Sequence, residues 1–179
     1  MEFHFSRSGI SLFFLNHHYV HIHLLYMKSS AAPTLPCMCA NIRRAARVLT
    51  QRYDEALRPL GLTITQFTIL QALSIAGDIT QGRLGEILAM DSTTLTRTLS
   101  VMKRQRWIAK IYGTDRRERR LRLTRVGRSE FNRAVPYWQK SQEMLRVQLG
   151  KERWHGLTKL MNDITTLVAE QGGFDGATI

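Results

Sequence analysis

The sequence predicts a mainly α-helical chain that carries one small β-hairpin, an α+β arrangement, and three observations lead to this prediction. Apolar residues recur every three or four positions in most stretches between residues 38 and 170, which is the spacing of amphipathic helices. Two short stretches, residues 108–112 and 120–124, have the composition and pattern of β-strands. Two closely spaced helices directly precede these strands. This order predicts a winged helix-turn-helix with further helices on both sides.

The first predicted helix covers about residues 38–57, and the breaker sequence at residues 58–61 (RPLG) ends it. Thr63 and Gln66 then form a capping box, which opens a second helix that reaches about residue 74. The apolar residues of these two helices recur at helical spacing. They are Ile42, Ala45, Ala46, Leu49, Tyr53, Ala56, Leu57, Phe67, Leu70 and Leu73.

Residues 81–89 and 92–104 are predicted to form the helix-turn-helix, because only two residues separate them. Thr80 can cap the first of these helices, and either Asp91 or Ser92 can cap the second. We expect one shared apolar face, with Gly85 leaving room for close approach. Its residues are Leu84, Ile87, Leu88, Met90, Leu95, Leu99 and Met102.

Two long helices complete the chain. Pro136 is expected to kink the first of them, and the second begins after Gly150. Their apolar residues exceed what a small winged domain needs for its own core, so we expect a dimer interface. These residues are Phe131, Val135, Trp138, Leu145, Leu149, Trp154, Leu157, Leu160, Met161, Ile164, Leu167 and Val168.

Positive charge is concentrated in the middle of the chain. Residues 41–126 contain 17 Lys and Arg against seven Asp and Glu, whereas the net charge of the whole chain is +12. Residues 97–125 alone contain eleven basic residues against two acidic ones. Such a concentration on one supersecondary unit predicts a polyanionic partner, and double-stranded DNA is the first candidate.

The cysteines and the N-terminal segment carry few further signals. Two cysteines, Cys37 and Cys39, are too few for a disulfide framework, so we expect the protein in the reducing cytoplasm. We expect neither a cofactor nor a metal in the body of the protein. Residues 10–27 are apolar but interrupted by histidines, so they are too short and too polar for a membrane span. We expect residues 1–36 to be a poorly ordered extension, with Met27 as the natural first residue. A secretion signal and a histidine metal site are the alternatives.

The order of elements and three residue strings resemble the MarR family of transcriptional regulators. The strings are LRPLGLTITQFTIL, ITQGRLGEILAMDSTTLTRTL and GTDRRERRLRLTRVGR. The resemblance implies a triangular homodimer with two winged lobes that bind a near-palindromic operator, and a repressor that a small molecule or an oxidant releases. The expected organisation is a MarR-type domain at residues 37–171, with dimer helices at about 38–58 and 127–170, a winged helix-turn-helix at about 62–126 and a frayed tail at 172–179.

The second helix of a helix-turn-helix enters the major groove by its N-terminal part. Arg97 can reach a guanine edge or a phosphate there. The alternative for the hydroxyl residues is that they only cap the helix. The major-groove candidates are Ser92, Thr93, Thr94, Thr96 and Arg97.

The arginine-rich hairpin tip suits a minor groove, where narrow A·T tracts attract arginine. Arg116, Arg117 and Arg119 are the candidates, against the alternative of a solvated charge run. The resemblance implies that Arg117 is the wing-tip arginine and that Asp115 steadies it. We expect Lys103 and Arg104 at phosphates.

Cys39 is the candidate trigger. It lies 14 residues before Tyr53, a register that resembles the peroxide-reactive cysteine of the organic-hydroperoxide branch of the family. A helix N-terminus favours the thiolate, and oxidation would give a sulfenic acid and then a mixed disulfide, for which Cys37 is one partner. Tyr53 matches one supporting tyrosine of that branch, whereas Arg43 and Ile64 stand at the other two positions. The alternatives are an incidental thiol and a small-molecule effector.

Two other classes of function compete with a DNA-binding regulator. A thiol enzyme could use Cys39, but the sequence offers no recognisable base or oxyanion constellation, and His155 is the only histidine beyond residue 23. We therefore expect no enzyme. A basic membrane-surface protein anchored by residues 10–27 is the third class, and we expect no membrane partner.

Overall fold

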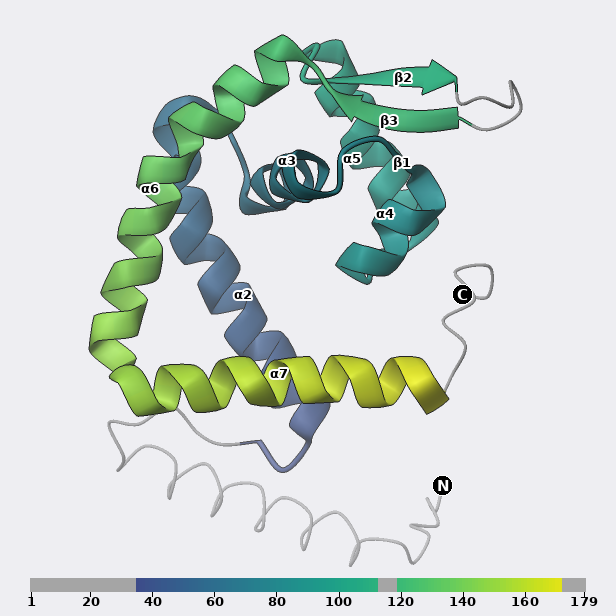
Figure 1. The fold of residues 1–179 in the computed structure, drawn as a ribbon. Coiled ribbons are helices and arrows are strands. Elements are labelled where there is room, and N and C mark those ends of the chain that lie inside the picture. The colour runs from purple at the N-terminus through teal and green to yellow at the C-terminus, as the bar shows by residue number, and fades with distance from the viewer. Residues whose placement is uncertain (1–34, 113–118, 172–179) are drawn as a thin grey trace, which may run out of the picture. The chain divides into compact units, whose positions relative to one another are not determined.

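The computed structural model describes residues 35–112 and 119–171, with side chains up to residue 167 (Figure 1). The chain divides into two compact units, residues 1–46 and residues 47–179. The predictions for the N-terminal extension, for Asp115, Arg116 and Arg117, and for the C-terminal tail lie outside the described residues.

The order of elements agrees with the sequence prediction, and most helix bounds agree to within two residues. Two differences concern the sheet. The last strand begins at Arg119, one residue earlier than expected, and a two-residue strand precedes the helix-turn-helix. The elements are α2 (Met38–Leu57), η1 (Arg58–Leu60), α3 (Ile64–Ala76), β1 (Ile79–Thr80), α4 (Gln81–Leu88), α5 (Ser92–Arg104), β2 (Ile108–Tyr112), β3 (Arg119–Leu123), α6 (Arg125–Leu149) and α7 (Lys151–Gln171).

The three strands form one antiparallel sheet in the order β1-β3-β2. In β3, Leu121 pairs with Ile79 of β1 on one side and with Lys110 of β2 on the other. The short strand β1 therefore ties the start of the helix-turn-helix to the hairpin. In Figure 1, α3 lies between α6 and α4 within the larger unit.

Side-chain caps define where the helices begin. The predicted capping box at Thr63 is confirmed, because its hydroxyl accepts from the Gln66 backbone while the Gln66 side chain accepts from the Thr63 backbone. Thr80 caps α4 as expected. Asp91, rather than Ser92, is the N-cap of α5. The helix α6 continues through Pro136 to Leu149.

The hydrophobic core is centred on Phe67 of α3. Its ring stacks against Phe131 at 5.4 Å and against Trp138 at 5.5 Å, both on α6. The predicted core residues of α3 and α5 are buried, but Ile87 of α4 is 47% exposed. The prediction for Ile87 was wrong because α4 has only eight residues and buries only the face around Leu84.

The predicted apolar face of α2 is not a core face, since only Leu57 of this helix is buried. Leu49 is 38% exposed. Several apolar residues of α7 are exposed to a similar or larger extent. In the described part of the chain no single helix has the length and hydropathy of a membrane span. The pair Met38–Leu60 and Ile64–Ala76, bent by 80°, meets those criteria only when the two are combined.

Candidate nucleic-acid interface

The N-terminal half of α5 presents polar side chains to solvent and keeps its apolar side chains inside. Leu95, Leu99 and Met102 are each at most 1% exposed, as the helical spacing predicted. The predicted major-groove residues are all exposed. They are Ser92, Thr93, Thr94, Thr96 and Arg97.

The first turn of α5 is held by two side chains. The carboxylate of Asp91 accepts from the Thr94 backbone N–H at 2.8 Å, and the hydrogen bonds to Thr94 lower the pKa of Asp91. The amide of Gln81, the first residue of α4, donates to the Thr96 hydroxyl oxygen at 2.8 Å. Gln81 therefore orients one of the predicted reading side chains. Sequence reasoning missed this residue, because a contact 15 positions away leaves no local pattern.

The turn between α4 and α5 is tight. A Cβ at Gly85 would lie 3.3 Å from the Met90 carbonyl and 3.5 Å from the Leu95 side chain, so the predicted close approach is confirmed. Ala89 ends α4 in the left-handed region at φ 47°. That conformation costs a residue with a Cβ about 1 kcal/mol.

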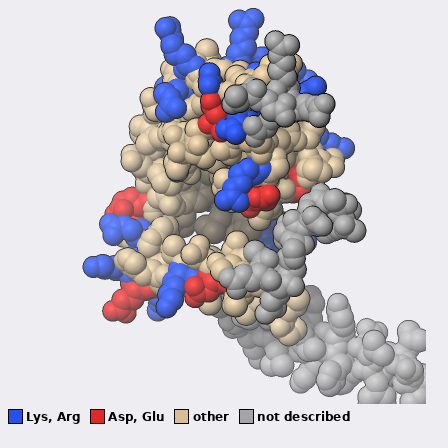
Figure 2. All heavy atoms as spheres, turned by 45° about the vertical axis from the view of Figure 1, so that its right-hand side comes forward, with Lys and Arg blue, Asp and Glu red and all other residues tan. Residues whose placement is uncertain are grey.

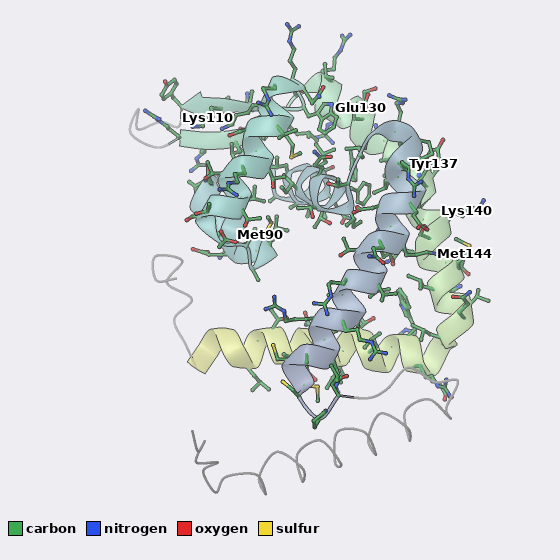
Figure 3. All side chains as sticks on the ribbon, turned by 180° about the vertical axis from the view of Figure 1, so that it is seen from behind. Met90, Lys110, Glu130, Tyr137, Lys140 and Met144 are labelled. Atoms are coloured by element: carbon green, nitrogen blue, oxygen red, sulfur yellow. The ribbon has the colours of Figure 1, made fainter. Side chains whose placement is uncertain are left out.

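Two lysines lie side by side at the far end of α5. Lys103 is half-buried, and burial, followed by the nearby positive charge of Lys110 on β2, lowers its pKa. Lys110 is exposed on the hairpin (Figure 3). Arg104 is also exposed. In Figure 2, most of the charged side chains drawn in colour at the upper end of the molecule are Lys and Arg, and Figure 1 places the sheet at that end. Two cations so close together favour an anion between them.

The base of the wing is fixed by an ion pair. The Arg122 guanidinium donates through Nε to Asp78 Oδ1 at 2.8 Å and through a second nitrogen to Oδ2. The hydrogen bond from Arg122 holds the pKa of Asp78 below its usual range. Arg120 also donates to the Asp78 backbone carbonyl at 3.4 Å. These two arginines brace β3 against the turn before β1, whereas Arg119, at the start of β3, is exposed.

The wing is joined rigidly to α6. The Thr124 hydroxyl caps α6 through the Gly127 N–H at 3.0 Å, and it also donates towards the carbonyls of Arg106 at 2.6 Å and Trp107 at 3.0 Å. The Thr124 N–H donates to the same Trp107 carbonyl at 3.0 Å. One residue thus links the end of the wing, the turn after α5 and the start of α6.

The redox candidates lie in two different units of the chain. Cys37 and Cys39 are free and exposed, and the Asn41 side chain ties the lead-in to α2 by donating to the Cys37 carbonyl at 3.1 Å. In the larger unit, the Tyr53 hydroxyl donates to Gln142 Oε1, and burial raises the pKa of Tyr53. Within residues 35–112 and 119–171, no group of three His, Cys, Asp or Glu side chains could hold a metal ion.

Comparisons with known proteins agree with this geometry. Residues 60–120 match the family described as MarR family. The transcriptional regulator MosR of Mycobacterium tuberculosis, solved in complex with DNA, shares 36% identity at a TM-score of 0.68, covering 75% of this chain and 97% of that one. An uncharacterised HTH-type transcriptional regulator, YwoH of Bacillus subtilis, is 29% identical over 90 residues, which are 50% of this chain and 66% of that protein.

A further structural neighbour supports the fold alone, since its identity is low. A mutant form of Escherichia coli MarR, solved in complex with operator DNA, has a TM-score of 0.65 at 23% identity, covering 71% of this chain and 92% of that one. MosR is both more than 30% identical and matched over nearly its whole length. Residues 60–120 match the MarR family, and the structure has the helix-turn-helix and wing described above. Because of this match and the similarity to MosR, the chain belongs to the MarR family of transcriptional regulators.

Proposed function

We propose that this protein binds double-stranded DNA through α5 and the wing. The observation that carries the proposal is the division of α5 into a buried apolar face and an exposed polar N-terminal face, which ends in Arg97. Short hydroxyl side chains and one arginine suit the donor and acceptor edges of the major groove. Lys103, Lys110 and Arg104 supply positive charge for phosphates, which carry most of the affinity in such complexes.

The wing residues extend the interface to the minor groove in this proposal. Arg119 would begin the contact, and Arg116 and Arg117 would continue it, with Asp115 holding Arg117. Arg120 and Arg122 have a different role, because their contacts with Asp78 brace the wing rather than reach outward. Arg117→Ala should weaken operator binding by about 1–3 kcal/mol.

The working form in this proposal is a homodimer formed through the helices outside the winged domain. Apolar side chains on α7 are exposed, among them Leu160 at 53% and Leu167 at 55%. An apolar groove of about 480 Å³ also runs along α2, α6 and α7, lined by Leu49, Tyr53, Gln142, Leu145, Leu149, Trp154, Leu157, Thr158, Met161, Asn162 and Thr165. Exposed apolar surface of this kind is typical of an interface. The domain would cover residues 37–171, and two copies would place two α5 helices on a near-palindromic operator.

We further propose that the protein is a repressor that a small ligand or oxidation of Cys39 releases. Cys39 is exposed in the first turn of α2, where a thiolate is accessible to a hydroperoxide. The thiolate would attack the peroxide oxygen to give a sulfenic acid and an alcohol. A second thiol, such as Cys37, would then form a disulfide and release water.

The test is a gel shift on the DNA upstream of the protein's own gene, with and without an organic hydroperoxide. We expect a saturable shift that hydroperoxide abolishes in the wild type and leaves intact in Cys39→Ser. If Cys39→Ser still loses DNA on treatment, oxidation at this residue is not the trigger. If Arg117→Ala binds as well as the wild type, the wing does not contribute to the site.

A further inference from the structure

Thr96 differs from its neighbours on α5 in how its hydroxyl is hydrogen-bonded. Thr98 donates its hydroxyl proton to the Thr94 carbonyl at 3.0 Å, and Ser100 donates to the Thr96 carbonyl at 2.8 Å. Both protons are therefore turned back towards the helix itself. The Thr96 hydroxyl oxygen instead accepts from the Gln81 amide at 2.8 Å. No residue that the structure describes accepts the Thr96 proton.

A threonine within a helix can turn its hydroxyl in two ways. It divides between two rotamers, because its Oγ1 can bond a backbone carbonyl three or four residues earlier. Thr98 makes this bond to Thr94. The corresponding acceptor for Thr96 is the carbonyl of Ser92, and the described structure has no hydrogen bond between these two residues. The hydrogen bond from Gln81 competes with that alternative and keeps the Thr96 hydroxyl away from its own helix.

Both partners of this hydrogen bond stand on anchored backbone. Gln81 follows Thr80, which caps α4 and pairs with Arg120 of β3. Thr96 follows Leu95, which is 1% exposed in the core. Gln81 is itself half-buried, whereas Thr96 is exposed. The hydrogen bond therefore joins a supporting side chain on α4 to a side chain that faces a partner outside the protein.

The contact limits what Thr96 can offer to that partner. A hydroxyl has one proton and two acceptor lone pairs, and the Gln81 amide occupies one of the acceptor positions. The proton is left for a partner. When DNA excludes water from the interface, this proton needs an acceptor, because an unsatisfied buried donor destabilises a complex. The acceptors in the major groove are guanine O6 and N7, adenine N7 and thymine O4, whereas cytosine N4 and adenine N6 are donors.

We propose that Gln81 is a positioning residue for DNA recognition. Its amide sets the rotamer of Thr96 and makes the Thr96 hydroxyl a hydrogen-bond donor, so that α5 selects a base acceptor at that place in the major groove. The inference rests on the proposed function, in which α5 binds DNA. It assigns Gln81 an effect on base preference that acts through Thr96 and not through a contact of its own.

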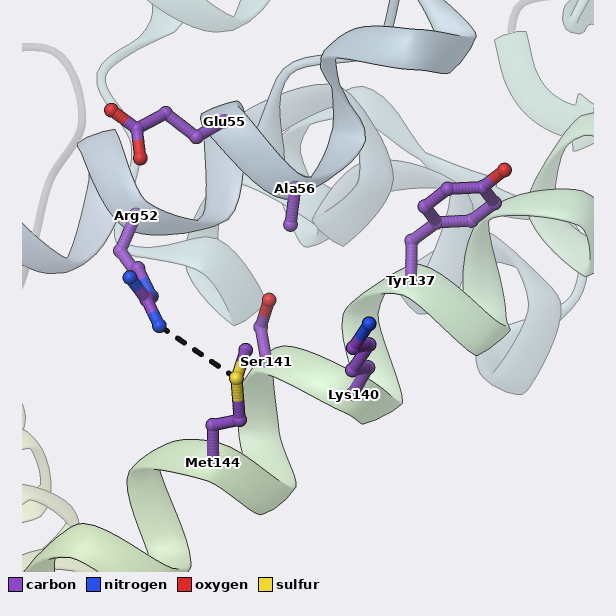
Figure 4. Close-up of a pocket in the computed structure, with 7 residues that line it drawn as sticks. All are labelled: Arg52, Glu55, Ala56, Tyr137, Lys140, Ser141 and Met144. Atoms are coloured by element: carbon purple, nitrogen blue, oxygen red, sulfur yellow. Dashed lines mark hydrogen bonds between the residues drawn. The ribbon is translucent and has the colours of Figure 1, made fainter.

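The pair of Gln81 and Thr96 lies apart from the concave surfaces of the larger unit. The pocket of about 360 Å³ between α2 and α6 is lined by residues such as Arg52, Ala56 and Tyr137 (Figure 4). The apolar groove assigned above to dimerisation is lined by residues of α2, α6 and α7. Neither lining includes a residue of α4 or α5. Substitution of Gln81 therefore changes the recognition helix without changing the wall of either site.

The first test uses the full-length protein without DNA. Three-bond NMR couplings from the Thr96 methyl carbon to its own backbone nitrogen and carbonyl carbon report its rotamer. We expect one dominant rotamer in the wild type. In Gln81→Met, which keeps the length of the side chain but removes the donor, Thr96 should populate a mixture, while Thr98 stays unchanged as the internal reference. Identical Thr96 couplings in the two proteins would overturn the positioning role.

The second test measures base preference with duplexes that carry every single base-pair substitution of one operator half-site. Thr96→Val keeps the shape of the side chain but lacks the hydroxyl, and it should lose about threefold to tenfold discrimination at one base pair. Gln81→Met should lose discrimination at the same base pair. The double variant should lose no more than Thr96→Val alone, because Gln81 acts through Thr96. Additive losses, or a loss at another base pair, would overturn the proposal.

Two controls accompany these variants. Gln105→Met makes the same substitution at an exposed residue beyond the other end of α5, and Lys159→Gln changes an exposed position on α7. Both should discriminate between bases like the wild type.

Base analogues test whether Thr96 donates. A deazapurine that lacks N7, an aminopurine that lacks O6 and a pyrimidinone that lacks O4 each remove one acceptor from the affected base pair. One of them should weaken the wild type about threefold to tenfold and leave Thr96→Val unchanged. If none does, Thr96 is not a donor to a base. A wild type that binds no duplex would refute the proposed function, whereas the couplings in the DNA-free protein would still decide whether Gln81 sets the Thr96 rotamer.

Discussion

Gly127→Ala is the substitution for which the structure gives the clearest prediction. A Cβ at Gly127 would lie 2.0 Å from the Trp107 carbonyl oxygen, 2.7 Å from its carbon and 2.9 Å from Leu123 Cδ1. Trp107 must therefore move away by about 1 Å or more. Its carbonyl accepts from the Thr124 N–H at 3.0 Å and shares the single hydroxyl proton of Thr124, also at 3.0 Å, with the nearer Arg106 carbonyl, and both contacts would be strained by that shift. Overpacking at about 1–3 kcal/mol and one hydrogen bond at about 1 kcal/mol predict a loss of about 2–4 kcal/mol.

The assay for Gly127→Ala is urea unfolding followed by circular dichroism, at one protein concentration for all variants because an oligomer's stability depends on concentration. Gly156→Ala on α7 is the matched control, since nothing lies within 4 Å of its added Cβ. It should keep or raise stability by up to about 1 kcal/mol, because alanine is the better helix former. A Gly127→Ala protein within about 1 kcal/mol of the wild type would refute the rigid junction between wing and α6.

Three further predictions concern stability. Phe67→Ala removes the ring between Phe131 and Trp138 and should cost about 3–5 kcal/mol in urea unfolding. Thr63→Ala removes the capping box and should cost about 1 kcal/mol, whereas Thr63→Ser should retain most of that stability. Arg122 lowers the pKa of Asp78 in the folded state. The ionised Asp78 carboxylate therefore stabilises the fold at neutral pH. This stabilisation is lost as the pH falls from the ordinary pKa of a carboxyl group towards the lowered pKa of Asp78. Asp78→Asn should therefore unfold at lower denaturant than the wild type at pH 7, with a smaller difference at acid pH. An equal difference at both pH values would contradict this reasoning.

Features set by local chemistry could be predicted from the sequence. The Thr63 capping box, the burial of Leu95 and Leu99 and the tight turn near Gly85 depend on residues a few positions apart, and all three predictions are confirmed. The two-residue strand β1 could not be predicted, because two residues show no alternation and their pairing with β3 is a tertiary contact.

Features that depend on distant residues were missed or wrongly predicted. The Gln81 contact with Thr96 and the Asp78 contact with Arg122 join segments 15 and 44 positions apart. Arg122 has no role of its own in the sequence-based predictions, whereas in the structure it pairs with Asp78 while its side chain stays 56% exposed. Helical periodicity gives the direction of an apolar face but not its width, and for this reason it placed the exposed Ile87 in the core.

The central claim is that α5 reads DNA, and the most direct measurement is fluorescence anisotropy with a labelled duplex from upstream of the gene, against an unlabelled random duplex as competitor. Arg97→Ala should weaken binding by about 1–3 kcal/mol, while Lys159→Gln should bind like the wild type. For the wild type, the logarithm of affinity should fall linearly with the logarithm of salt concentration, with a slope of about −0.9 per phosphate contacted. Binding that ignores salt, or an Arg97→Ala protein as tight and as selective as the wild type, would contradict the account.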